Sequence, residues 1–270
     1  MSVVQASGLV TAPALARTYS HPSYADAWEC VQDYRSVLDY HASNSQAGAS
    51  KIARSLELPR SRVRPWLNGS TPDPVRAILA AENHDWLEQD FSDRTFRGLN
   101  VLVAWILSGG SLNSNFVPQF TISDKDDERR IDDAFDAVGV DYDFLRGGDL
   151  QRATEYRPLE DASVLGRVLW VLDAPLGRKN EAARIRLPHY LPDSPRRIRQ
   201  DFVVTYLKNR GHVSEDNAVL RFREDRSGQY LHDLAELIHE TTGEGVRVSE
   251  KNIIVSPAAT TEVRSWTPVF

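Results

Sequence analysis

Four side chains suited to contacting nucleic acid cluster within five positions of the sequence: Arg60, Ser61, Arg62 and Arg64. Arginine donates paired hydrogen bonds to phosphates and to guanine edges, and serine donates to phosphate oxygens. At the start of an exposed helix, such side chains reach base edges and the backbone of a duplex. The cluster therefore indicates a nucleic-acid contact, against the alternative of an arginine face that is only solvated.

A second set of such side chains lies on predicted strands. In the segments 116–122 and 218–223, polar and apolar residues alternate, which is typical of a strand with one buried face. A later strand, 246–249, continues the pattern. For any one strand, the alternative is the ordinary solvated face of an antiparallel sheet. Because the pattern recurs in both halves of the chain, we favour a face that reads base edges, with these candidates: Gln119, Thr121, Arg221, Arg223, Arg247 and Ser249.

The segment 50–67 is predicted to form two short helices that position the first cluster. Ile52, Ala53 and Val63 are spaced to pack between these helices, and the pattern resembles a helix-turn-helix. Pro65 lacks a backbone donor, so it should kink or shorten the second helix.

Further helices are expected at 24–40 and 74–87, while 1–13 is expected to be a frayed leader. We therefore expect an all-α domain over residues 1–92.

From Leu99 the sequence pattern changes, and an internal repeat appears with a spacing of about 101 residues. Each copy is predicted to run helix, strand, helix, strand. The expected elements are helices 99–107 and 126–138 around strand 116–122 in the first copy, and helices 202–207 and 228–242 with strands 218–223, 246–249 and 252–255 in the second. A further helix is expected at 159–172, and a proline-rich linker at 187–199. The fold class expected for 93–270 is α+β, duplicated about a pseudo-two-fold axis, with repeats at about 99–158 and 200–256.

The ends of the two repeated helices resemble the two motifs of a LAGLIDADG homing endonuclease. The first motif is LVAWILSGGSL at 102–112, and the second is FVVTYLKNRGHV at 202–213. The resemblance extends over about 94–255. It implies that the two helices pack side by side along the pseudo-two-fold axis, and that two curved sheets form a saddle over the DNA major groove.

The resemblance places the catalytic aspartates of that family at Gly109 and Arg210. Such acids hold the divalent ions that activate water for phosphodiester cleavage. Glycine offers no ligand, and an arginine repels a cation by about 4 kcal/mol per pair of unit charges at about 4 Å and an effective dielectric of about 20. Asp201 lies nine residues earlier, roughly 13 Å along a helix, which is too far to substitute. We therefore expect no catalytic residues, no metal and no cofactor.

Arg210 itself has two interpretations, which the sequence leaves open. Its guanidinium is suited to holding a backbone phosphate through paired hydrogen bonds. Alternatively, it points to solvent after the end of its helix.

Composition limits the remaining possibilities. The net charge is −6 and the isoelectric point about 5.7, but a local basic surface can still bind phosphates. The cations are 27 arginines and 5 lysines, which indicates a GC-rich or salt-adapted source. The single cysteine, Cys30, excludes an intrachain disulfide and a thiolate zinc site, and favours a reducing cytoplasm. No apolar run approaches the roughly 18–20 residues of a membrane span.

Other sites of chemistry are not indicated. The sequence has no phosphate-binding glycine loop ending in Lys-Ser/Thr, no HExxH and no zinc spacing. The six acids between 124 and 133 are interpreted as a helix cap and a solvated face, above an apolar stripe of Ile131, Phe135 and Val138. Four histidines are interpreted as structural or surface residues: His189, His212, His232 and His239.

These observations predict a sequence-specific protein that binds double-stranded DNA in the cytoplasm, associated with the nucleoid and without a membrane. A transcription regulator built on an inactivated homing-endonuclease scaffold is the main hypothesis. The alternatives are an active nuclease with displaced acids and an RNA-binding intron maturase. Other transcription or recombination proteins are further candidate partners.

Overall fold

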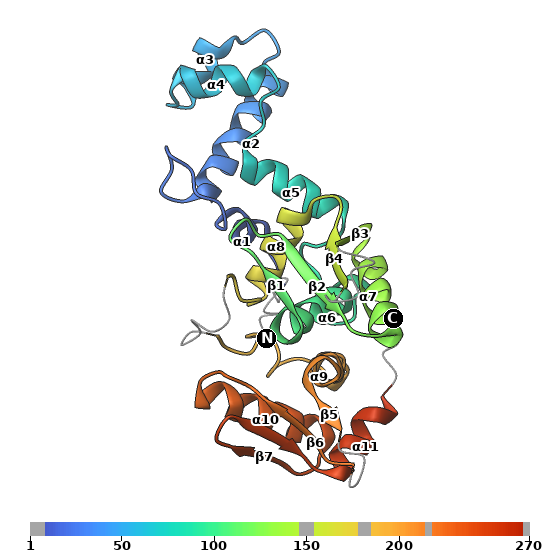
Figure 1. Cartoon of the computed structure of the whole chain (residues 1–270). Helices are drawn as coiled ribbons and strands as arrows, with labels where there is room; N and C mark the ends of the chain where they lie inside the picture. The colour runs from blue at the N-terminus through green and yellow to red at the C-terminus, as the bar shows by residue number, and fades with distance from the viewer. Residues whose placement is uncertain (1–8, 146–153, 178–184, 214–217, 267–270) are drawn as a thin grey trace.

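The computed structural model describes residues 9–145, 154–177, 185–213 and 218–266 (Figure 1). The first part is helical, with α1 (Ala12–Ala16), α2 (Ala27–Ser43), α3 (Ala49–Ser55), α4 (Arg60–Leu67) and α5 (Asp73–Asn83). Figure 1 shows α3 and α4 at the far end of α2, away from both sheets. Val10 is buried and α1 begins at Ala12, so the expected frayed leader is wrong for residues 9–13, and its residues 1–8 lie outside the described part.

Each of the next two units pairs a long helix with a four-stranded antiparallel sheet. The first unit contains α6 (Arg94–Ser108), β1 (Gly110–Leu112), β2 (Pro118–Ile122), α7 (Lys125–Val138), β3 (Tyr142–Leu145) and β4 (Thr154–Pro158), and α8 (Ala162–Val171) follows it. The second contains α9 (Arg196–Arg210), β5 (His212–Val213), β6 (Leu220–Arg223), α10 (Gly228–Thr242), β7 (Val246–Ser249), β8 (Asn252–Val255) and α11 (Pro257–Ser265). The sheet orders are β1-β2-β4-β3 and β5-β6-β8-β7, so the described strands run in the same order in both units. An α+β fold with antiparallel sheets is confirmed.

The two long helices α6 and α9 pack against each other between the sheets (Figure 1). Almost every side chain of α6 from Phe96 onward is buried, because α7, α8 and α9 cover it on different sides. Buried polar bonds fix how α6 and α9 pair. The amide of Asn100 donates to the carbonyl of Ile198 at 3.0 Å and accepts from the Tyr190 hydroxyl at 2.9 Å. An unpaired buried amide costs about 1–3 kcal/mol, so these bonds disfavour any other alignment.

An ion pair adds to this seam. Arg97 of α6 contacts Asp201 of α9 at 2.9 Å, and both side chains are largely buried. Burial raises the pKa of Asp201, and the neighbouring Arg97 opposes that rise.

Apolar side chains form two clusters. The larger one includes Leu15 and Ile78 from the first 92 residues together with the cores of both sheet units. The smaller one belongs to α2, α3 and α4 and includes Cys30, Ile52, Val63 and Trp66. The predicted division at residue 92 stays a prediction, but α1 and α5 share the larger core with the sheets. No helix in the described ranges is long and apolar enough to cross a bilayer.

Several predicted boundaries are wrong, and backbone geometry explains two of them. The strands expected at 116–122 and 218–223 begin two residues later, since Phe116 and Ala218 adopt positive φ angles of 59° and 54° that no strand accommodates. The linker expected to reach residue 199 ends before α9 begins at Arg196, and α6 and α9 are both longer than expected. Helices α1 and α11 and strands β1 and β5 were not predicted, and the strand expected after α7 was given no bounds, whereas two strands, β3 and β4, follow it.

Gly166 is where α8 comes closest to the loop before β2. A methyl group at this position would overlap the carbonyl of Phe116, whereas a methyl at Gly228 would meet nothing. We expect Gly166→Ala to lower the free energy of unfolding by about 2–3 kcal/mol, the usual cost of overpacking. Gly228→Ala should change it by less than about 0.5 kcal/mol. Urea denaturation of both variants measures this, and equal midpoints would contradict the close packing of α8.

Candidate nucleic-acid interface

Helices α3 and α4 meet through the side chains that their spacing predicts. Ile52, Ala53 and Val63 are buried, and Trp66 joins them from the last turn of α4. Helix α4 continues through Pro65 for two more residues and ends at Leu67. The small core therefore sets the orientation of α4 and decides which of its arginines face outward.

Arg60 and Arg64 are exposed one helical turn apart, and Ser61 is exposed beside them. The two arginines lie at the rim of a shallow depression of about 430 Å³, which His41 and Asn68 also line. Two cations and a hydroxyl on one exposed helical face can contact neighbouring phosphates or base edges.

Arg62 is engaged inside the helical part instead. Its guanidinium donates to the Tyr24 hydroxyl at 2.8 Å, lies 4.2 Å from the centre of that ring, and approaches Asp33 at 3.7 Å. Burial, followed by the hydrogen bond to Asp33, raises the pKa of Tyr24. Arg62 therefore holds α4 to α2. Its guanidinium is engaged within the helical part, so the base contact expected from the sequence is wrong for this residue.

The second sheet carries an arginine-rich face. The register aligns Arg221 of β6, Ile254 of β8 and Arg247 of β7 in one row across the sheet. Arg223, Asn252 and Ser249 form the next row. The three arginines and Ser249 are exposed, whereas Leu220, Phe222, Ile253 and Val255 face the core. With strands about 4.8 Å apart, Arg221 and Arg247 start roughly 10 Å from each other, so the arginine-rich face can contact separate phosphates or bases.

The first sheet presents a different face. Gln119 and Thr121 of β2 share a side, as expected, but both are only half exposed. Thr121 pairs with Glu155, and Asp143 on β3 pairs with Arg157. The carboxylates of Asp143 and Glu155 outnumber the guanidinium of Arg157, so this face has no excess positive charge. The two sheets therefore share a strand order but differ in their suitability for a polyanion.

The C-terminal ends of α6 and α9 meet. The Asn209 amide donates to the Ser108 hydroxyl at 2.9 Å, and a methyl group on Gly109 would lie 3.2 Å from that amide. Gly109 and Arg210 thus occupy adjacent helix ends. Arg210 does not simply point to solvent, because it donates to the carbonyl of Arg223 at 3.0 Å and pairs with Glu224 at 3.3 Å.

Glu224 is a buried acid that the sequence interpretation missed. Its carboxylate accepts from the Tyr206 hydroxyl at 2.6 Å and pairs with Arg226 at 3.1 Å as well as with Arg210. The alternation that places Leu220 and Phe222 inward also places residue 224 inward, and this signal could have identified it. Arg226 also donates to the carbonyl of Leu107, and so connects the second sheet to the end of α6.

The remaining candidates lie apart from this seam. Within the described ranges, no group of three or more His, Cys, Asp or Glu could hold a metal ion. Asp124 caps α7 as expected, but Asp127 is buried and pairs with Arg130, so the expected solvated face is wrong at that position.

His189 is exposed and contacts Asp173 at 2.6 Å. His232 and His239 are also exposed, while the side chain of His212 lies outside the described part.

No family model matches the chain, and no curated protein matches it either. Among solved structures, it is similar to the crystal structure of the N-terminal LAGLIDADG domain of DUF199/WhiA. That similarity has a TM-score of 0.43 at 10% identity, and covers 68% of this chain and 90% of the other.

Arg62→Ala should lower the free energy of unfolding by about 1–2 kcal/mol, because it removes a hydrogen bond and a cation–π contact. Arg60→Ala, on an exposed side chain of the same helix, should change stability by less than about 0.5 kcal/mol. Thermal and urea unfolding of both variants measure the difference. A fully stable Arg62→Ala protein would mean that Arg62 does not hold α4 to α2.

Proposed function

We propose that this chain is a sequence-specific protein that binds double-stranded DNA without cleaving it, and that it acts as a transcription regulator. The observation that carries the proposal is the arginine-rich face formed by Arg221, Arg223 and Arg247 on an exposed sheet. Arginine side chains read guanine through paired hydrogen bonds and bind phosphates equally well. A twisted sheet can lie in the major groove, where each base pair presents a distinct pattern.

The scaffold that we propose is a duplicated LAGLIDADG-like unit preceded by a helix-turn-helix. The shared strand order of the two sheets supports the duplication, as does the meeting of α6 and α9 at positions 108 and 209. The buried contacts of Ile52 and Val63 support the helix-turn-helix. In this arrangement Arg60 and Arg64 form a second contact surface, separate from the arginine-rich face because α4 lies away from both sheets (Figure 1).

The difference between the two sheets bears on how DNA binds. On the first sheet two acids, Asp143 and Glu155, outnumber Arg157 and disfavour phosphates, while the arginine-rich face of the second sheet attracts them. We therefore infer that the second sheet supplies most of the affinity, and that Gln119 and Thr121 contribute base contacts at most. The overall charge of −6 does not oppose this, because binding responds to the local field.

The same geometry favours a protein that does not cut DNA. Gly109 offers no ligand, and Arg210 brings a cation to the helix ends. The buried acid nearby, Glu224, is already paired with Arg210, Arg226 and Tyr206. A divalent ion would have to displace these partners, and breaking a buried ion pair costs about 3–5 kcal/mol.

The central test replaces Arg221, Arg223 and Arg247 with alanine and measures affinity for duplexes selected from genomic DNA. Each base-reading arginine is worth about 1–3 kcal/mol, so the triple variant should lose at least a hundredfold in affinity and show a shallower salt dependence. Arg264→Ala removes one exposed arginine of α11, outside the sheet; this single-charge control should bind as wild type. Equal binding by the triple variant, or tighter binding of structured RNA at matched salt, would contradict the proposal.

A second test concerns cleavage. Wild-type protein incubated with its bound duplex should leave supercoiled and linear DNA intact in Mg²⁺ or Mn²⁺, and chelation of the metal should not change its affinity. Gly109→Asp with Arg210→Asp restores acids but places one beside Glu224, so we expect lower stability and weaker DNA binding. Nicking by the wild-type protein, abolished by chelation, would show that it is a nuclease with displaced acids.

A further inference from the structure

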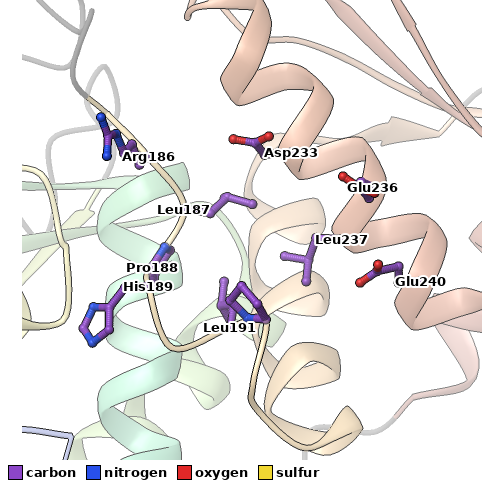
Figure 2. Close-up of a pocket in the computed structure, with 10 residues that line it drawn as sticks. Arg186, Leu187, Pro188, His189, Leu191, Asp233, Glu236, Leu237 and Glu240 are labelled. Atoms are coloured by element: carbon purple, nitrogen blue, oxygen red, sulfur yellow. The ribbon is translucent and has the colours of Figure 1, made fainter.

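A cleft of about 420 Å³ opens between the segment Arg186–Pro192 and helix α10. Figure 2 shows its two walls, with the segment on one side and the acidic side chains of α10 on the other. The segment leads into α9, and the cleft therefore lies beside the seam between the two sheet units.

The floor of the cleft is apolar. Leu187 and Leu191 come from the segment, and Leu237 comes from α10 (Figure 2). Leu191 and Leu237 are buried, and Leu187 is half exposed. Pro188 and Pro192 fix two φ angles of the segment wall, which limits the backbone freedom of that wall.

The α10 wall is acidic. Asp233, Glu236 and Glu240 are three and four residues apart, so they lie along one side of the helix. Glu240 approaches Arg199 at 3.7 Å, and the Asp233 carboxylate accepts a hydrogen bond from Gln229 at 2.7 Å. Neither Asp233 nor Glu236 has a salt bridge within the described part of the chain. Arg186 also lines the cleft, from the segment wall, so three carboxylates stand against one arginine of the lining and the excess charge is negative. With the half-exposed Leu187 beside them, these carboxylates attract a ligand that is both cationic and apolar.

The cleft faces away from the arginine-rich face. Leu231 and Leu234 lie on the buried side of α10. They belong to the larger apolar cluster together with Phe222 and Ile253 of the second sheet. The arginines of β6 and β7 point from the opposite side of that sheet. A ligand in the cleft and a duplex on the arginine-rich face would therefore not compete for the same surface.

We propose that this cleft docks a basic segment of a partner protein, in which a leucine-like side chain is flanked by arginine or lysine. The apolar side chain enters over Leu187 and Leu237, and the cations pair with Asp233 and Glu236. Nucleic acid is disfavoured here because the carboxylates repel phosphates. The proposal does not depend on DNA binding, and it can be tested without DNA.

The test uses a synthetic twelve-residue peptide with a repeating Arg-Leu-Leu-Arg pattern, labelled for fluorescence anisotropy. Asp233→Asn with Glu236→Gln should weaken its binding about fivefold at low salt, because two exposed ion pairs are lost. Glu244→Gln with Glu250→Gln removes the same charge from exposed positions outside the cleft, and should change affinity less than twofold. Leu187→Asn should weaken binding because it removes an apolar contact at the floor of the cleft. Hydrogen exchange should show protection of 185–192 when the peptide is bound.

Three outcomes would overturn the proposal. Equal weakening in both charge variants would mean general attraction of a basic peptide to an acidic protein. Equal binding of a matched Glu-Leu-Leu-Glu peptide would mean that charge does not select the ligand. Sedimentation showing self-association that the Asp233 and Glu236 changes abolish would identify a second copy of the chain as the occupant.

Discussion

The packing of α6 against α9 is the constraint on which the rest of the structure depends. Each helix leads directly into the first strand of its own sheet, so the alignment of the two helices sets where the sheets lie. Polar bonds at Asn100, the Arg97–Asp201 pair and the contact between Ser108 and Asn209 fix that alignment along the length of the seam. If the seam were entirely apolar, sliding α6 along α9 by one helical turn would cost less free energy. Buried amides and charges disfavour such slips because each would lose its partner.

Arginines occupy two kinds of environment in this chain, and burial of the neighbouring groups distinguishes them. Arg62 and Arg226 meet acids and aromatic rings and hold elements together, and Arg210 helps to neutralise a buried carboxylate. The arginines of the arginine-rich face meet solvent on the open side of a sheet, where their charge is available to a ligand. An abundance of arginine in an acidic protein is therefore not by itself a binding signal. The register of β6, β7 and β8 supplies the information that composition lacks.

Sequence patterns predicted the periodic elements well, and predicted side-chain partners poorly. The bounds of α10 were predicted because Gly228 and Gly243 bracket a clear apolar stripe, and the alternation in β6 placed Arg221 and Arg223 outward. The start of β2 was not predicted, because nothing local reports that Phe116 takes a positive φ. The engagement of Arg62 with Tyr24 joins residues 38 positions apart, and no periodicity reports such a contact. The pairing of Arg210 with Glu224 was not predicted for the same reason, since Glu224 follows a different element, β6.

The most direct test of the account is hydroxyl-radical footprinting of the full chain on a selected duplex. If α4 and the arginine-rich face bind one DNA molecule together, the footprint will contain two protected segments. Replacing Arg60 and Arg64 will remove one segment, and replacing Arg221, Arg223 and Arg247 will remove the other. A single protected segment that survives the loss of the sheet arginines would contradict the claim that the second sheet is the principal DNA-binding surface.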